Sequence, residues 1–185
     1  MPRNIEIKAR IANINALAAL AGQIADQGPF EIPQDDTFFR CSSGRLKLRQ
    51  FSDSAGELIY YRRPDHRGPK ESYYLLSPTS APESLRESLS LAYGQIGRVK
   101  KHRTLFLAGR TRIHLDRVEH LGDFLELEVV LAENEASTDG VGEANGLIEK
   151  LGIEPNQLIE EAYIDLLARS APPSQGVRGS QGRFP

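Results

Sequence analysis

The sequence lacks the features of a disulfide-rich, secreted or membrane-anchored protein. Cys41 is the single cysteine among 185 residues, so an internal disulfide is excluded, and no Ser-His or Cys-His pairing points to a nucleophilic role for its thiol. No apolar run approaches the roughly 20 residues of a membrane-spanning helix. The chain enters a strand pattern directly after Met1, without the apolar region of a signal peptide, and we therefore expect a cytoplasmic location.

Common nucleotide and metal signatures are also missing. The chain has no Gly-x₄-Gly-Lys-Ser/Thr loop, and the glycines between Gly140 and Gly146 have neither the spacing nor the βαβ context of a dinucleotide-binding turn. The four histidines lack the paired spacing of zinc ligands; they are His66, His102, His114 and His120. These absences argue against P-loop, dinucleotide-binding and zinc-motif proteins.

Basic residues are scarce toward the end of the chain. Between Glu119 and Asp165, Lys150 is the only basic residue against thirteen acidic ones, whereas residues 40–117 hold sixteen Lys or Arg against seven Asp or Glu. Such asymmetry is typical of nucleic-acid binding by the basic part. It is equally typical of two parts that face each other across a divalent cation or a phosphate chain, or of two solvated surfaces. Composition alone leaves these alternatives open.

The order of predicted elements indicates an α+β fold rather than alternating βαβ units. Apolar periodicity predicts helices over residues 14–24, 82–93, 142–151 and 157–168. Strands are predicted over residues 5–11, 35–41, 45–51, 57–63, 72–76, 98–107, 110–116 and 124–131. The Gly-, Pro-, Ser- and Gln-rich segment 170–185 is predicted to be a disordered tail, which leaves residues 1–169 as one domain.

The predicted strands carry unusually many fixed charges on one face. In the first strand, alternation places Glu6 and Lys8 on one face with Asn4 and Arg10, and isoleucines on the other. Five further strands show similar alternation; their charged residues include Arg45, Lys47, Arg49, Arg62, Lys101, Arg103, Arg112, Asp116, Glu126 and Glu128. For any single strand, a solvated sheet face is the simplest interpretation.

Six such strands with helices available to cover their apolar faces favour a closed antiparallel barrel with a polar interior. Cations inside a barrel would repel one another at low dielectric unless an anion lay among them. A linear polyphosphate fits, because Arg and Lys bind phosphate oxygens. Glu126 and Glu128 lie two apart and so share a face, where Mg²⁺ or Mn²⁺ would reconcile carboxylates with phosphate.

The sequence resembles the CYTH superfamily of triphosphate tunnel metalloenzymes, which includes class IV adenylate cyclases and thiamine triphosphatases. The resemblance spans roughly residues 4–167. The matching segments are Asn4–Lys8, Gly44–Arg49, Leu58–Pro64, Val99–Arg103, Ile113–Asp116, Leu121–Glu128 and Ala162–Leu167. The segments around Arg45, from Tyr60 to Asp65 and from Leu121 to Glu128 are most similar to proteins labelled as class IV adenylate cyclases.

The resemblance implies an α+β fold, an eight-stranded antiparallel β-barrel that forms a triphosphate tunnel, with flanking helices. It implies metal ligands for Mg²⁺ or Mn²⁺ at Glu6, Glu126 and Glu128. The triphosphate-binding residues that it implies are Lys8, Arg45, Lys47, Arg62, Lys101, Arg103 and Arg112. Asp116 would join the metal site or the cation network, and Lys8, Arg62 and Asp116 are the expected catalytic residues. Tyr163 would close one tunnel mouth or pack in the core.

Asn4 departs from the Glu-x-Glu-x-Lys motif with which the family opens, since it stands where the first glutamate is expected. An amide oxygen can ligate a metal but carries no charge. The expected reaction is conversion of ATP to cyclic AMP and pyrophosphate, and the alternative is hydrolysis of an inorganic, nucleoside or thiamine triphosphate.

Two further classes of function remain alongside these enzymes. Asn4 motivates a non-catalytic binder of polyphosphate or nucleotide. A nucleic-acid-binding barrel is disfavoured, because the tyrosines and phenylalanines are too scattered to form a stacking surface. We expect a small-molecule triphosphate and no membrane as partners, and the resemblance allows a homodimer because dimers occur in the family.

Overall fold

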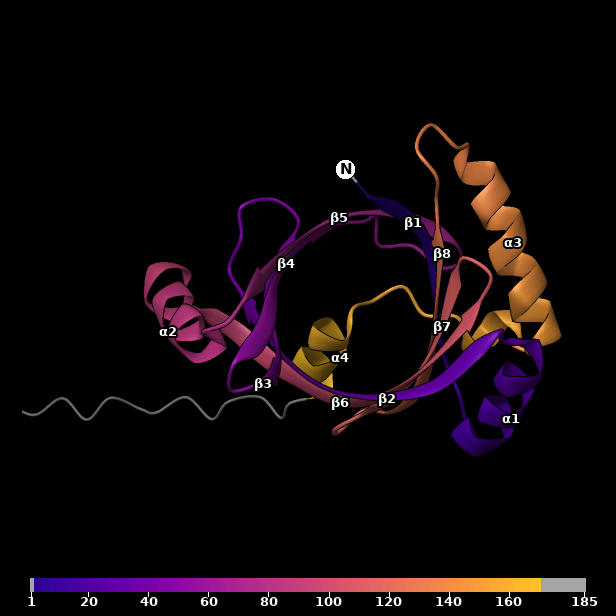
Figure 1. Cartoon of the computed structure of the whole chain (residues 1–185), viewed down its shortest axis with the longest axis horizontal. Coiled ribbons are helices and arrows are strands. Elements are labelled where there is room, and N and C mark those ends of the chain that lie inside the picture. The colour runs from indigo at the N-terminus through magenta and orange to yellow at the C-terminus, as the bar shows by residue number, and fades with distance from the viewer. Residues whose placement is uncertain (1, 171–185) are drawn as a thin grey trace, which may run out of the picture.

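The eight strands of the chain close into one antiparallel barrel. The computed structural model describes residues 2–170, and the strand order around the barrel is β1-β5-β4-β3-β2-β6-β7-β8 (Figure 1). The strands are β1 (Arg3–Arg10), β2 (Gln27–Phe39), β3 (Arg45–Ser52), β4 (Ala55–Arg62), β5 (Lys70–Thr79), β6 (Gln95–Ala108), β7 (Thr111–Val118) and β8 (Gly122–Val130). This architecture confirms the predicted fold.

Strand β1 closes the barrel because it pairs with strands on both sides. Its residue Glu6 lies opposite Lys70 of β5 and opposite Glu128 of β8. Residues opposite one another in an antiparallel pair share a face, so the register carries one set of side chains around the whole interior. In β1 the inner set is Asn4, Glu6 and Lys8, while Ile5 and Ile7 are buried on the outer face.

The helices cover the apolar outer faces of the strands. Helices α1 (Ile14–Ile24) and α3 (Ser137–Lys150) lie on one side of the barrel, and α2 (Pro82–Tyr93) lies on the opposite side (Figure 1). The largest core forms where α1 and α3 meet the outer faces of β1, β7 and β8, and it includes Ile7, Leu17, Ile113, Leu127 and Leu147. The apolar core therefore surrounds part of the barrel, and the charged residues occupy its interior.

Helix α4 (Tyr163–Ser170) closes one end of the barrel. Figure 1 shows its ribbon within the ring of strands. Residues 162–164 pack against inward-facing Phe38, Val99 and Phe124. The ring of Tyr163 makes an edge contact with that of Phe124, at 4.9 Å between centroids. This end of the barrel is therefore filled by side chains of α4 and the residue before it.

Three predicted boundaries differ from the structure by about five residues or more. Helices α1 and α2 match their predicted ranges, but β2 begins at Gln27 rather than residue 35, because pairing with β6 extends it past Gly28-Pro29. Helix α3 begins at Ser137 rather than residue 142. The last helix begins at Tyr163 rather than residue 157: a 3₁₀ turn spans Pro155–Gln157, and Ile159 then donates its backbone N–H to the carbonyl of Lys8.

The structure also bears on the predicted tail and on the question of a membrane-spanning helix. Ser170, the first residue of the predicted tail, ends helix α4, and the rest of that tail lies outside the described residues. Within residues 2–170, no helix has the length and apolar character needed to cross a membrane.

Candidate functional site

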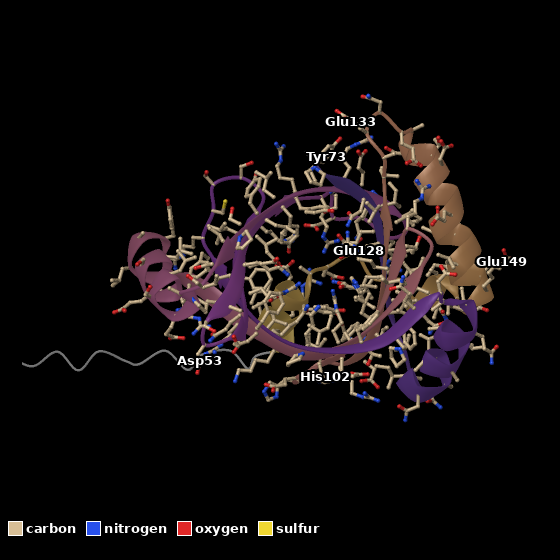
Figure 2. All side chains as sticks on the ribbon, in the orientation of Figure 1. Asp53, Tyr73, His102, Glu128, Glu133 and Glu149 are labelled. Carbon is tan, nitrogen blue, oxygen red and sulfur yellow. The ribbon has the colours of Figure 1, made fainter. Side chains whose placement is uncertain are left out.

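The inner faces of the strands line a charged cavity of about 290 Å³. Figure 2 shows Glu128 directed into the ring, whereas Asp53 and His102 lie on its outside. The cationic residues of the lining are Lys8, Lys47, Arg49, Arg63, Lys101, Arg103 and Arg112, and the carboxylates are Glu6, Asp36, Glu57, Glu126 and Glu128. Most cations have a carboxylate partner, so the cavity is a network of ion pairs.

Asp116 holds two of these cations from behind the cavity. Its carboxylate is fully buried and accepts hydrogen bonds from Arg103 at 2.6 and 2.7 Å, from Lys101 at 2.7 Å and from the Tyr163 hydroxyl at 3.0 Å. Burial disfavours the charged form, but the positive charges of Arg103 and Lys101 outweigh burial and hold the pKa of Asp116 well below its usual range. Asp116 is thus a fixed anion that orients two phosphate-binding candidates.

Glu126 makes a second cluster with cations from two strands. Lys8 Nζ lies 2.7 Å from Glu126 Oε1 and 3.8 Å from the centroid of the Tyr163 ring. Arg103 donates to the other carboxylate oxygen of Glu126. The charges of Lys8, Lys101 and Arg103 overcome the effect of burial and hold the pKa of Glu126 well below its ordinary value. Glu126 is therefore ionised, and both its oxygens are engaged.

Asp36 makes a third cluster on the opposite wall. It accepts hydrogen bonds from Lys47 at 2.7 Å and from Arg49 at 2.7 and 2.8 Å. Although Asp36 is buried, these two cations lower the pKa of its carboxyl well below the ordinary value. Burial and the neighbouring Arg49 lower the pKa of Lys47 to about 8, with Asp36 opposing them. Two β3 cations thus share one carboxylate.

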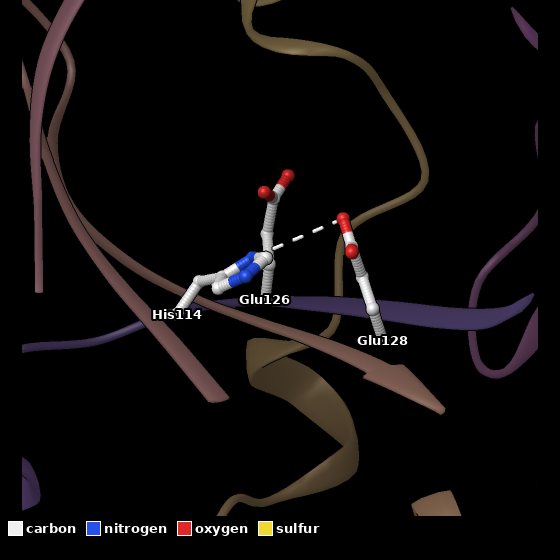
Figure 3. A group of neighbouring side chains, drawn as sticks. All are labelled: His114, Glu126 and Glu128. Carbon is white, nitrogen blue, oxygen red and sulfur yellow. Dashed lines mark ion pairs between the residues drawn. The ribbon is translucent and has the colours of Figure 1, made fainter. Parts of the chain in front are cut away.

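Glu128 and His114 form the part of the cavity best suited to a divalent metal ion. Figure 3 shows His114, Glu126 and Glu128 together, and one ligand atom from each lies within 4.8 Å of the other two. Burial, together with the nearby Glu6 and Glu126, raises the pKa of Glu128, while burial and Arg103 lower the pKa of His114 well below its ordinary value.

The donors of this cluster fit the expected ion. His114 Nδ1 is buried and lacks a hydrogen-bond partner among residues 2–170. Glu6 lies directly opposite Glu128 on the neighbouring strand, so two acidic residues project from adjacent positions of the inner face. A divalent cation would relieve both features, because it accepts nitrogen or oxygen donors and offsets neighbouring negative charges.

Most residues predicted for the site meet in the cavity. Lys8, Lys47, Lys101, Arg103 and Arg112 line it, as do Glu6, Glu126 and Glu128, and Asp116 lies directly behind. Arg45 is an exception. It lies on the inner face of β3 toward the closed end, where it binds Asp65 at 3.0 Å and Asp165 at 2.8 Å.

The placement of Arg62 corrects the prediction for this residue. Arg62 is exposed, and Arg63 lines the cavity instead, with its Nε 3.5 Å from Glu6 Oε1. The reason is strand register: Tyr61 lies opposite Arg45, so Tyr61 and Arg63 share the inner face and Tyr60 and Arg62 the outer one. The sequence alone could not show which of the two adjacent arginines faces the cavity.

Arg49 and Asp36 were also missed as site residues. Arg49 continues the alternation of Arg45 and Lys47, and this signal was sufficient to include it. Asp36 gave no comparable signal, because its role depends on the pairing of β2 with β3, which places it opposite Arg49.

Known proteins share both the sequence pattern and the fold. The sequence matches the CYTH domain family over residues 2–163. Adenylate cyclase CyaB of Aeromonas hydrophila is 22% identical over 174 residues, which cover 90% of this chain and 89% of that protein. The structure of the PH1012 protein of Pyrococcus horikoshii OT3 is 26% identical with a TM-score of 0.78, and the match covers 88% of this chain and 98% of that chain.

A plant structure is similar in fold alone. The HpAC1 protein of Hippeastrum is 15% identical to this chain with a TM-score of 0.64, and the match covers 92% of this chain and 96% of the plant chain.

Proposed function

The chain belongs to the CYTH domain family, and from this premise we propose that it binds a triphosphate in the barrel cavity with a divalent metal ion and cleaves a phosphoanhydride bond. Enzymes of this family act as adenylate cyclases or triphosphatases and are generally metal-dependent. The observation that carries the proposal is a barrel cavity whose cations, from β1, β3, β6 and β7 and from Arg63 just after β4, lie among carboxylates. Phosphoryl chemistry needs this combination, because catalysis rests on positioning and charge neutralisation.

The ion pairs of the cavity indicate how triphosphate and metal depend on each other. Lys8 and Arg103 both pair with Glu126, which limits their contact with phosphate. Both cations would be released to the phosphate oxygens when Glu126 binds a metal ion. Glu6, Glu126 and Glu128 would hold Mg²⁺ or Mn²⁺, which supplies Lewis-acid polarisation of a phosphoryl oxygen when bound. Lys8, Lys101 and Arg103 would then orient the phosphate oxygens, with Asp116 fixing the latter two.

Cyclisation of ATP is the leading reaction. Attack of the ribose 3′-hydroxyl on the α-phosphorus forms the cyclic ester bond and releases pyrophosphate, and the hydroxyl proton leaves to a base or to solvent. The adenylate cyclase CyaB relative supports this assignment by its name. Lys8, in the cavity, remains a proposed catalytic residue, and Arg63 replaces Arg62 in the cavity lining; Asp116, directly behind, positions Lys101 and Arg103.

Hydrolysis of a triphosphate is the second candidate, with water attacking the terminal phosphorus. The structure offers one observation in its favour: the charged cavity is closed at one end by α4, and its volume of about 290 Å³ lies at the lower end of the range for small-molecule sites, which suits a compact triphosphate. The solved Hippeastrum protein is described as having a dominant triphosphatase activity. Inorganic or organic triphosphates are the substrates to compare with ATP.

Product analysis separates the two reactions. Purified protein is incubated with ATP, and separately with inorganic triphosphate, in Mg²⁺ and in Mn²⁺. Cyclic AMP with pyrophosphate identifies the cyclase, and orthophosphate release identifies the triphosphatase. Glu128→Gln is the matched control, since it keeps the shape of a cavity side chain but removes its charge, and its turnover should fall by at least about 10-fold.

Asn4 provides the test of a non-catalytic binder. Its side chain lines the cavity, and its Oδ1 atom is buried without a partner among the described residues. Turnover by the wild type with either metal rejects the binder. Retained triphosphate binding without turnover, together with activity in Asn4→Glu, would support the binder and contradict the proposed enzyme.

A further inference from the structure

His114 lies beside two of the glutamates expected to bind the metal ion, although the sequence offered no reason to count it among the ligands. It is on the inner face of β7 opposite Glu126, and Arg112, two residues earlier, is opposite Glu128. The imidazole therefore lies close to both carboxylates of β8, and Figure 3 shows it next to Glu126 with a dashed line to Glu128. The side chain is almost completely buried, with 3% of the residue exposed.

The nearest acceptor does not satisfy the imidazole nitrogen. His114 Nδ1 is 3.8 Å from Glu128 Oε1, which is longer than a hydrogen bond. Within residues 2–170 this atom has no hydrogen-bond partner. A buried polar atom left without a partner is unfavourable, so this arrangement calls for a ligand between the two side chains.

The carboxylate of Glu128 offers one oxygen toward the same point. Its Oε2 pairs with Arg112 at 3.3 Å, which leaves Oε1 directed to His114. Both carboxylate oxygens of Glu126 are paired, one with Lys8 and one with Arg103. Glu126 can therefore bind a metal ion only after one of these ion pairs breaks. His114 Nδ1 and Glu128 Oε1 are therefore the two donors that are available.

The spacing suits one ion after small side-chain rotations. Donors bound to the same ion at about 2.1 Å are at most about 4.2 Å apart. The three candidate donor atoms lie within 4.8 Å of one another. Closing this difference requires shifts well within the reach of a histidine and two glutamates.

We propose that His114 is a nitrogen ligand of the metal site, with Glu128 and then Glu126, and that this ligand makes the site select Mn²⁺ over Mg²⁺. Both ions take mainly oxygen ligands, but Mn²⁺, as a transition metal, accepts an imidazole nitrogen among them, whereas Mg²⁺ binds nitrogen weakly. The inference rests on the proposed function for its metal site, and it specifies which metal that site prefers.

Electron spin echo envelope modulation of the protein loaded with Mn²⁺ alone tests the ligand directly. A ¹⁴N modulation is expected in the wild type and should disappear in His114→Asn, which replaces the imidazole with an amide. His102→Asn is the matched control: His102 is 48% exposed at its side chain and pairs with Glu31 on the outer surface. This variant should keep the modulation.

Metal affinities give the second measurement. Titration of His114→Asn should show Mn²⁺ binding weakened by about 10-fold or more while Mg²⁺ binding changes little, so the selectivity for Mn²⁺ falls. Wild-type Mn²⁺ bound through oxygen ligands only would overturn this inference and leave the proposed function standing. Failure of the wild type to bind Mn²⁺ would overturn this inference, and failure to bind Mg²⁺ as well would overturn the metal dependence of the proposed function.

Discussion

Arg63 shows that the role of a side chain depends on the face of the strand from which it projects. It is 1% exposed at its side chain and lies beside Glu6 in the cavity, whereas its neighbour Arg62 is exposed. Both residues carry the same charge at nearly the same point of the chain. Any difference in their effect on ligand binding therefore reports which one faces the phosphate.

We expect Arg63→Gln to weaken triphosphate binding by about 10- to 100-fold, because one charge-assisted hydrogen bond is worth about 1.5–3 kcal/mol. Arg62→Gln should change the affinity by less than about 2-fold. Calorimetric titration with a non-hydrolysable triphosphate analogue measures both. Equal losses in the two variants would contradict the assignment of Arg63 to the cavity.

At the scale of elements, helix α3 is held against β1 and β8 by close approach at one glycine. A Cβ atom on Gly140 would lie 2.7 Å from side-chain atoms of both Ile5 and Leu131, which is closer than packed atoms approach. Gly146, six residues later in the same helix, has open space around the position of an added Cβ atom. Since β1 also carries Glu6 and Lys8, the packing of α3 supports the wall of the cavity.

Gly140→Ala should therefore lower the free energy of unfolding by about 1–3 kcal/mol through overpacking. Gly146→Ala should raise it by about 0.5–1 kcal/mol, because alanine restricts the unfolded chain and favours the helix. Urea denaturation compares the two with the wild type. Stabilisation by both substitutions would mean that α3 does not approach β1 as closely as described.

The whole molecule couples its stability to the ion pairs inside the barrel. Asp36 and Asp116 have pKa values lowered by their cationic partners, despite burial. A carboxyl with a lowered pKa in the folded state stabilises the fold above its unfolded pKa of about 3.9. This contribution is lost as pH falls below about 4, where the unfolded chain takes up protons first.

Acid denaturation should therefore reduce the free energy of unfolding steeply below pH of about 4. Asp36→Asn should be about 3–5 kcal/mol less stable at neutral pH, because Lys47 and Arg49 lose their carboxylate. Its stability should fall less steeply in acid, with one protonating carboxylate fewer. Asp53→Asn, in the exposed turn after β3, controls for loss of a charge. If the free energy of unfolding of Asp36→Asn fell as steeply in acid as that of the wild type, the proposed link between stability and these ion pairs would be contradicted.

Strand periodicity made much of the barrel predictable. A repeat of two residues separates charged from apolar side chains whatever the partner strand is, so Glu6, Lys8, Glu126 and Glu128 could be assigned to one polar interior from the sequence. Helices α1 and α2 were predicted with their observed bounds, because apolar spacing and flanking Gly and Pro residues are local signals.

Only the tertiary structure decided which charges meet. The choice of Arg63 over Arg62, the pairing of Asp36 with Arg49 and the approach of His114 to Glu128 follow from the register between strands. Arg45 meets Asp165 across 120 residues of chain. Local periodicity determines the face of a side chain, but contacts between segments remote in sequence depend on how the strands pair and on where α4 closes the barrel, and these are properties of the folded whole.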